Sequence, residues 1–214
     1  MSVVWSLAGL RILFFGEKVM YLDIKFKGDR NYAQGGDLFE LSQHSLIKFF
    51  GGGYLRKIAF KSFSKKHCLI ILEVRPDKGN HIIGGGIFSN KDGVDVKFWL
   101  VEGHSDICER YPFDEDELVE LSTIEGSKIF LSIQNKFSLI EHIVALTKKL
   151  NYHLTPDVKG KWVFGQLDLL DKLPVEYETV MIERISERKK MFSLNKIIVD
   201  EIEMGEIRFI VGAP

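Results

Sequence analysis

The sequence has little of what marks a disulfide-stabilised or metal-binding protein. Its 214 residues include two cysteines and five prolines. Neither Cys68 nor Cys108 stands in a CxxC motif or at a Cys/His ligand spacing. We therefore predict reduced structural thiols, no metal site and no cofactor, a combination that is typical of a cytoplasmic protein.

The chain also lacks an excess of charge of one sign. The 29 basic and 30 acidic residues give a formal net charge of -1, so no long-range field would gather a polyanion or an acidic membrane surface. We accordingly do not expect nucleic acid as the main partner. One basic run keeps an RNA-binding or RNA-processing function open as an alternative, although such a run is usually a solvated strand face; it consists of Arg56, Lys57, Lys61, Lys65 and Lys66.

The most apolar stretch is residues 3–15, and it is too short and too broken to span a bilayer. Arg11 interrupts it, and Gly16-Glu17-Lys18 ends it where a secretory signal would carry a small-residue cleavage site. We expect residues 1–19 to form an N-terminal extension or an additional strand, and we expect no membrane association.

The sequence does contain an internal repeat, in which the same order of secondary-structure elements occurs twice. In each half an extended segment precedes one amphipathic helix, and four β-rich segments follow without a further helix. The first half predicts a strand at 21–27, a helix at 37–50 and strands at 55–63, 68–74, 81–88 and 94–101. The second half predicts a strand at 129–133, a helix at 138–150 and strands at 162–170, 177–186, 191–200 and 206–211.

These elements divide the chain into four parts. The N-terminal extension covers residues 1–19, and the first unit covers 20–103. The second unit covers 127–214. Between the units, residues 104–126 contain the acidic run Asp114-Glu115-Asp116-Glu117, which is typical of a solvated surface or a helix start rather than a metal site, so we predict an acidic linker there.

Apolar residues cover much of the circumference of the first helix, so a sheet should enclose it. A ferredoxin-like duplication would need a second helix in each half, and none has adequate periodicity. The layout resembles a tandem, or double, hotdog fold, an α+β arrangement of two β-α-β-β-β-β units in which an antiparallel sheet wraps a central helix. The resemblance covers roughly residues 20–211, and it is to a topology rather than to a sequence signature.

Hotdog proteins generally act on acyl thioesters, in a pocket between paired units with the substrate carbonyl near the N-terminus of a central helix. The resemblance therefore implies a small-molecule substrate, such as a CoA or carrier-protein thioester, and a dehydratase or thioesterase reaction. The resemblance also makes it possible that the protein forms a homodimer. At a helix N-terminus, free N–H groups and the positive end of the helix dipole stabilise a carbonyl oxygen that gains negative charge.

The first half offers such a place at Gln34-Gly35-Gly36-Asp37. Gly35 and Gly36 would let the backbone approach a substrate carbonyl, and Asp37 would either cap the helix or act as a catalytic base. The alternative is a plain loop before a capped helix, because this kind of sequence is common there.

Both predicted helices also carry a histidine. Aligning Gln43-His44 with Glu141-His142 makes His44 an acid/base candidate and His142 a substrate-binding candidate, with a structural histidine as the alternative for each. Asp37 and His44 would lie about 10 Å apart along the helix, so they cannot form a hydrogen-bonded pair.

The loop before the first helix adds Asp29 as an acid/base candidate and Arg30 and Tyr32 as substrate-binding candidates, although a surface salt bridge explains Asp29 and Arg30 equally well. Residues 134–137 of the second half lack glycine and acid. We therefore expect one site, in the first half, and a degenerate second copy. A non-catalytic ligand-binding or assembly protein on the same scaffold is a further alternative, favoured if apolar side chains plug the helix N-terminus.

Three consecutive glycines, at 84–86, look at first like a phosphate-binding loop. The lysine and Ser/Thr of a P-loop are missing, and the GxGxxG spacing before a helix is absent as well. Within a strand pattern the glycines instead predict a β-bulge or a close approach of the helix backbone to the sheet.

Overall fold

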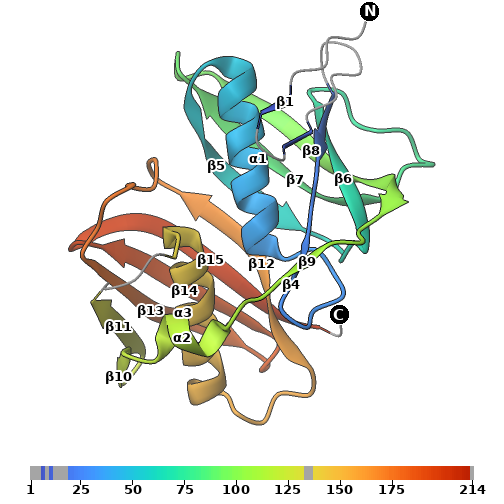
Figure 1. The fold of residues 1–214 in the computed structure, drawn as a ribbon. Coiled ribbons are helices and arrows are strands. Elements are labelled where there is room, and N and C mark those ends of the chain that lie inside the picture. The colour runs from blue at the N-terminus through green and yellow to red at the C-terminus, as the bar shows by residue number, and fades with distance from the viewer. Residues whose placement is uncertain (1–5, 8–9, 12–18, 133–136, 213–214) are drawn as a thin grey trace, which may run out of the picture. The chain divides into compact units, whose positions relative to one another are not determined.

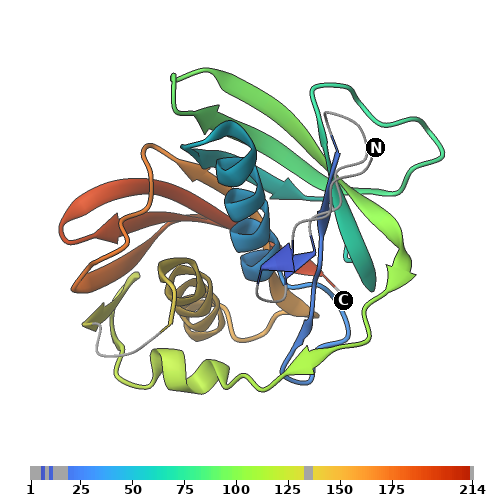
Figure 2. The same ribbon diagram turned by 45° about the horizontal axis from the view of Figure 1, so that its top comes forward.

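A computed structural model describes residues 6–7, 10–11, 19–132 and 137–212. The chain divides into residues 1–113 (unit 1) and residues 114–214 (unit 2). Each unit is an antiparallel sheet with one long helix packed on it (Figures 1 and 2). In the predicted N-terminal extension, β1 (Ser6–Leu7) pairs with β2 (Leu10–Arg11), and the rest of residues 1–18 lies outside the described residues.

Unit 1 has the predicted order of one strand, one helix and four strands. Its sheet runs β5-β7-β8-β6-β3, and every neighbouring pair is antiparallel. The helix α1 packs on β5, β7 and β3. The elements are β3 (Val19–Leu22), α1 (Gly35–Phe50), β5 (Gly53–Phe60), β6 (Lys66–Leu72), β7 (Ile82–Asn90) and β8 (Asp95–Asp106).

The strand predicted at 21–27 is divided in two by the structure. β3 ends at Leu22, and the backbone N–H of Ile24 then donates to Nδ1 of the His67 side chain on the neighbouring strand β6, at 3.0 Å, instead of to a backbone carbonyl. Two residues later β4 (Phe26–Lys27) pairs in parallel with β9 (Arg110–Tyr111). This separate pair of short strands brings Lys27 and Tyr111 side by side.

The helix α1 is enclosed on the sheet side, as its apolar pattern predicts. Leu46 is fully buried, as are Ile58 of β5 and Ile70 of β6. The helix ends at Gly51, which adopts φ 72° and donates its N–H to the carbonyl of Ile47. A left-handed glycine at this position is the usual way in which a helix stops.

Unit 2 repeats the plan and adds a short helix and an edge strand before it. Its sheet runs β10-β11-β13-β14-β15-β12, and α3 packs against the strands from β11 to β15. The elements are α2 (Glu115–Val119), β10 (Thr123–Glu125), β11 (Lys128–Ser132), α3 (Leu139–Leu154), β12 (Lys161–Leu169), β13 (Thr179–Arg188), β14 (Phe192–Val199) and β15 (Ile202–Gly212).

The last four strands of unit 1 do not form a simple meander, in which each strand would pair with the next one along the chain. β5 pairs with β7 rather than with β6, and β6 pairs with β8. Consecutive strands pair in the hairpin β7–β8, whose turn is held by Oδ1 of Asn90 accepting from the N–H groups of Asp92 and Val94. The connection from β6 to β7 therefore crosses over instead of forming a hairpin. In unit 2, by contrast, β13, β14 and β15 follow one another directly.

The segment predicted as an acidic linker, 104–126, contains regular structure. It holds the end of β8, all of β9, α2 and β10. The acidic run starts α2, because the side chain of Asp114 caps that helix by accepting from the N–H of Asp116 at 2.9 Å. The boundary between the two units lies between Phe113 and Asp114.

The three glycines at 84–86 lie in β7, where the sheet is irregular. Register shifts occur beside them, between Leu55 and Lys57 of β5 and between Ile82 and Gly84 of β7. A Cβ on Gly86 would lie 1.9 Å from the carbonyl oxygen of Lys57. The strand is thus irregular beside the glycines, and the close approach is made by the backbone of a neighbouring strand rather than by the helix.

Replacing Gly86 with alanine should therefore destabilise the protein, because the added methyl meets a backbone atom that cannot move alone. We expect Gly86→Ala to lower the free energy of unfolding by about 1–3 kcal/mol. Gly79→Ala is the control, since Gly79 is exposed and its added Cβ would meet no described atom within 4 Å. Urea denaturation of both variants tests this, and equal stabilities would contradict it.

Candidate functional site

The N-terminus of α1 is not covered by a capping side chain. Gln34 is the N-cap residue, and it forms no side-chain cap hydrogen bond within the described residues. Gly36 is buried, yet a Cβ on it would meet no described atom within 4 Å. First-turn N–H groups have no partner inside the helix, so this turn combines donor groups with room beside them. Such a turn can bind a carbonyl or carboxylate oxygen.

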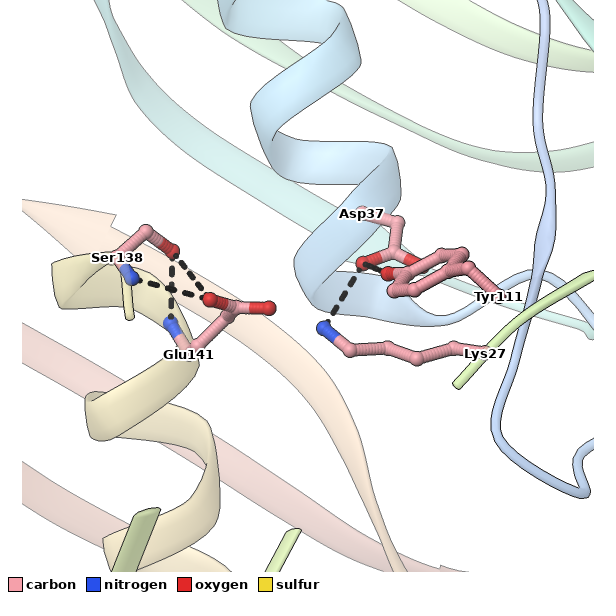
Figure 3. Close-up of polar contacts among 5 residues, drawn as sticks. All are labelled: Lys27, Asp37, Tyr111, Ser138 and Glu141. Atoms are coloured by element: carbon pink, nitrogen blue, oxygen red, sulfur yellow. Dashed lines mark hydrogen bonds and ion pairs between the residues drawn. The ribbon is translucent and has the colours of Figure 1, made fainter. Parts of the chain in front are cut away.

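Asp37 is the third residue of α1 and lies in a buried polar cluster (Figure 3). Its Oδ1 forms an ion pair with Nζ of Lys27 at 3.1 Å. The hydroxyl of Tyr111 donates to both carboxylate oxygens, at 3.2 Å each. The side chains of Lys27 and Asp37 are 5% and 11% exposed. The cluster fixes the Asp37 carboxylate beside the first turn, where it can accept a proton from water or from a substrate.

Aromatic rings complete the surroundings of Lys27. Its Nζ lies 3.9 Å from the ring centroid of Phe113 and 5.9 Å from that of Tyr111. A buried ion pair gains little net stability when both partners are present, but removal of one partner leaves an uncompensated charge. The structure of unit 1 at the start of α1 therefore depends on Lys27 and Asp37 being present together.

The loop that carries the other predicted residues is held by Arg110. Its guanidinium donates to the carbonyl oxygens of Gly28 and Arg30 and to Oδ1 of Asn31, the last at 2.7 Å. Asp29 is exposed on this loop, and Arg30 is partly exposed.

Tyr32, on the same loop, is partly buried. Its ring packs edge-on against Phe63, with 4.7 Å between ring centroids. The loop residues remain candidates for substrate contact: Asp29, Arg30 and Tyr32. The polar contacts described above for the Asp37 carboxylate come instead from Lys27 and Tyr111.

The predicted alignment of His44 with His142 is wrong, because the two helices start at different distances from these residues. His44 is the tenth residue of α1 and is exposed, whereas His142 is the fourth residue of α3 and is fully buried. Burial lowers the pKa of the His142 imidazole. The residue of α3 that corresponds to Asp37 is Glu141, the third residue of its helix.

Glu141 serves a different purpose from Asp37. It forms a capping box with Ser138, in which the N–H of Glu141 donates to the Ser138 hydroxyl and the N–H of Ser138 donates to Glu141 Oε2 at 3.0 Å (Figure 3). A capping box satisfies two of the free N–H groups of a helix start. The first turn of α3 is thus closed by its own side chains, and that of α1 is not.

Lys27 and Tyr111 were not predicted as site residues. Lys27 belongs to an alternating strand pattern in which it looks like a solvent-facing residue, and Tyr111 stands just before the acidic run. They meet through the parallel pairing of two strands of two residues each. Such short strands have no periodicity of their own, so no local signal in the sequence would have identified either residue.

Unit 2 contains a groove of about 840 Å³. Acidic residues of α2 and basic residues of α3 line it. Lys148 forms an ion pair with Glu115, and Lys149 donates to the carbonyl oxygen of Val119. Within the described parts of the chain, no group of three or more His, Cys, Asp or Glu residues could hold a metal ion. Over the same residues, no helix is long and apolar enough to cross a membrane.

No protein-family model and no curated protein matches the sequence. Solved structures do match along nearly its whole length. A candidate thioesterase from Novosphingobium aromaticivorans DSM 12444 has a TM-score of 0.53 at 9% identity, with 94% of this chain and 98% of that chain covered. A candidate thioesterase II from Thermobifida fusca YX has a TM-score of 0.53 at 10% identity, with 94% and 95% covered.

A third match is a bifunctional dehydratase-cyclase domain in ambruticin biosynthesis. It has a TM-score of 0.50 at 8% identity, with 99% of this chain and 95% of that chain covered. The matches confirm the predicted α+β tandem hotdog fold over nearly the whole chain.

Lys27→Met should destabilise the protein strongly, because it leaves the buried Asp37 carboxylate without its cation. We expect a loss of about 3–5 kcal/mol in the free energy of unfolding, and we expect the double variant Lys27→Met/Asp37→Asn to recover most of it. Denaturant titration measures both.

Lys25→Met is the matched control, since Lys25 forms an exposed ion pair with Glu109 at 2.6 Å. Its unfolding midpoint should hardly change. If Lys27→Met/Asp37→Asn were as unstable as Lys27→Met alone, the loss of stability in Lys27→Met would not come from an unpaired charge.

Proposed function

We propose that the protein binds acyl thioesters and hydrolyses them, with the thioester carbonyl at the first turn of α1. The observation that carries the proposal is the uncapped, glycine-lined turn beside the buried Asp37 carboxylate. Structural similarity to two candidate thioesterases over 94% of the chain supports the substrate class.

Each residue then has a chemical role. The N–H groups of Gly35 and Gly36 donate to the carbonyl oxygen and stabilise the negative charge that it gains. Asp37 accepts a proton from the water molecule that attacks the carbonyl carbon. Lys27 and Tyr111 hold the carboxylate in place. The thiolate leaves and takes up the proton that Asp37 had accepted, which restores the carboxylate, and the products are a carboxylic acid and a free thiol.

Hydrolysis fits unit 1 better than dehydration does. Dehydration of a hydroxyacyl thioester needs one group to remove the α-proton and a proton donor for the departing hydroxyl. His44, predicted for such a role, is exposed and about 10 Å from Asp37 along the helix axis. An acyl-thioester dehydratase is the second candidate, because one of the structurally similar proteins is a bifunctional dehydratase-cyclase domain.

Two rival functions have less support. A non-catalytic binding protein would be favoured by apolar side chains plugging the first turn of α1, whereas a Cβ on Gly36 would meet no described atom within 4 Å. In the basic run that suggested RNA, Arg56 pairs with Asp95 at 2.7 Å, and Nζ of Lys61 lies 5.8 Å from the ring centroid of Trp99. These contacts neutralise part of the positive charge of the run and restrict its side chains, so less of it can bind a phosphate backbone.

We further propose that the protein works in the cytoplasm and that its two units arose by duplication. Cys68 and Cys108 are free thiols, and burial raises the pKa of Cys68 to about 12, so that thiol is inert. The acidic residue at the third position of both central helices, Asp37 and Glu141, supports a duplication. A homodimer stays a prediction.

Two substitutions at the first turn of α1 test the proposed reaction. Asp37→Asn removes the base and should lower turnover by about 10²–10⁴-fold. Gly36→Ala puts a methyl group where the carbonyl would approach, and it should lower turnover about 10²-fold without loss of stability. Thiol release from a panel of acyl-CoA substrates measures turnover.

His44→Ala is the control, and it should hydrolyse the same substrates at the wild-type rate. Thermal denaturation of Gly36→Ala shows whether the fold is retained. Wild-type turnover in both Asp37→Asn and Gly36→Ala would refute the assignment of this turn as the active site.

A further inference from the structure

One ring nitrogen of His67, in unit 1, faces two partners that need opposite protonation states. His67 lies in β6, and its side chain is 14% exposed. Its Nδ1 lies 3.0 Å from the backbone nitrogen of Ile24 and 3.4 Å from Oδ1 of Asp23. A backbone N–H can only donate a hydrogen bond, and an ionised carboxylate can only accept one. Nδ1 can therefore serve one of the two partners at a time.

The neutral imidazole serves Ile24. Nδ1 then has a bare lone pair that accepts from the Ile24 N–H, and the ring proton is on Nε2. Ile24 is fully buried, so water does not reach this N–H. A buried backbone N–H requires an acceptor within the protein, and His67 provides it.

The protonated imidazole serves Asp23 instead. A proton on Nδ1 would point at the N–H of Ile24, and two donors that face each other repel. The same proton can form a charge-assisted hydrogen bond with the carboxylate of Asp23, which is stronger than a hydrogen bond between neutral groups. Uptake of one proton therefore exchanges one partner for the other.

The other ionisable groups that face His67 do not compete for Nδ1. The ring of Tyr21, in β3, lies 5.4 Å from the imidazole between centroids. Glu109, just before β9, forms an ion pair with Lys25 at 2.6 Å. The hydrogen bond and the charge of Lys25 lower the pKa of Glu109, and His67 contributes a smaller part of this effect. Glu109 is thus already engaged.

The strand β8 flanks β6 on the side away from β3. Where it passes His67 it carries Gly103, which has no ionisable group and whose added Cβ would lie 2.8 Å from the His67 carbonyl oxygen. The remaining ionisable residues close to His67 along β6 and β8 are exposed or partly exposed, so solvent screens their charges; they are Lys65, Lys66, His104 and Asp106.

The exchange acts on the segment that carries Lys27. Ile24 lies between β3, which ends at Leu22, and β4, which begins at Phe26. β4 pairs with only two residues of β9, so the hydrogen bond at Ile24 is an important attachment of this segment to the main sheet of unit 1. Lys27 then forms the buried ion pair with Asp37 (Figure 3). Loss of the attachment at Ile24 would reach Lys27 through three residues of backbone.

We propose that His67 is a proton-operated switch: when neutral it holds the connection between β3 and β4 through the N–H of Ile24, and when protonated it turns to Asp23 and releases that connection. Histidine is suited to this task because its charge ordinarily changes between pH 5 and 8. The switch itself does not depend on the proposed function. Its effect on turnover does.

Nitrogen NMR and amide hydrogen exchange of the wild-type protein between pH 8 and pH 5 test the switch. At pH 8, Nδ1 of His67 should resonate as an unprotonated nitrogen, and the Ile24 amide should be protected from exchange. As His67 becomes protonated, the protection factor of the Ile24 amide should fall by about tenfold or more, in step with the imidazole signal.

Three results of that experiment would overturn the switch. They are an Nδ1 that is protonated at pH 8, an imidazole that stays neutral down to pH 5, and an Ile24 amide that stays protected after His67 is protonated. The measurement uses the wild-type protein, so it does not depend on whether any variant folds.

Two variants assign the effect to the two partners. His67→Asn keeps an acceptor at the same bonded distance from Cβ as Nδ1, and this acceptor does not titrate, so protection of the Ile24 amide should no longer change with pH. Asp23→Asn removes the charge that the protonated imidazole turns to, so protection should be lost only at lower pH. His153→Asn, at an exposed histidine of unit 2, is the control and should behave as the wild type. A wild-type pH response in His67→Asn would refute the proposal.

Thiol release from acyl-CoA substrates tests the effect on the active site, and this part rests on the proposed function. The wild-type rate should fall more steeply between pH 7 and pH 5 than the rate of His67→Asn. Identical pH profiles would overturn the link between His67 and the site and leave the proposed function standing. Absence of turnover in the wild-type protein would overturn the proposed function, whereas the switch would still be decided by the NMR measurement.

Discussion

The buried ion pair between Lys27 and Asp37 is the contact on which the start of α1 depends. It joins the strand β4 to the first turn of the helix, and the hydroxyl of Tyr111 adds β9 to the same cluster. Lys27 and Tyr111 hold the Asp37 carboxylate beside the first turn, and the N-cap residue Gln34 forms no side-chain cap hydrogen bond within the described residues. The cluster therefore explains two features together: a carboxylate fixed in a buried position, and first-turn N–H groups that a ligand can use.

The two units begin their central helices in different ways. In α3, Ser138 and Glu141 satisfy the free N–H groups within the helix itself. In α1, the glycine-lined start leaves them open, which costs helix stability unless a ligand or water provides acceptors. A helix start that is less stable alone and more stable with a bound carbonyl is a common property of binding sites in proteins. This difference is the physical reason for assigning the thioester to unit 1.

Much of the fold could be predicted from the sequence. Apolar periodicity located both central helices and nearly all the long strands, because one buried face leaves a clear pattern along the chain. The order of strands within a sheet leaves no such pattern. In unit 1, β5 pairs with β7 and β6 pairs with β8, and neither pairing could be read from the segments themselves.

The candidate site was predictable in part. Gly35, Gly36 and Asp37 are neighbours in the sequence, so their place at a helix start was visible there. Lys27 and Tyr111 reach the site through strand pairing between distant segments, and a sequence does not record such pairing. The wrong alignment of His44 with His142 has a related cause: a helix start is set by its capping contacts, and an error of a few residues moves a side chain to another face.

A crystal structure of the protein with a non-hydrolysable acyl-CoA analogue, with CH₂ in place of the thioester sulfur, tests the central claim most directly. The account predicts that the analogue's carbonyl oxygen lies within hydrogen-bond distance of the N–H groups of Gly35 or Gly36, beside the carboxylate of Asp37. An acyl group bound elsewhere, with this first turn of α1 in contact with solvent alone, would contradict it.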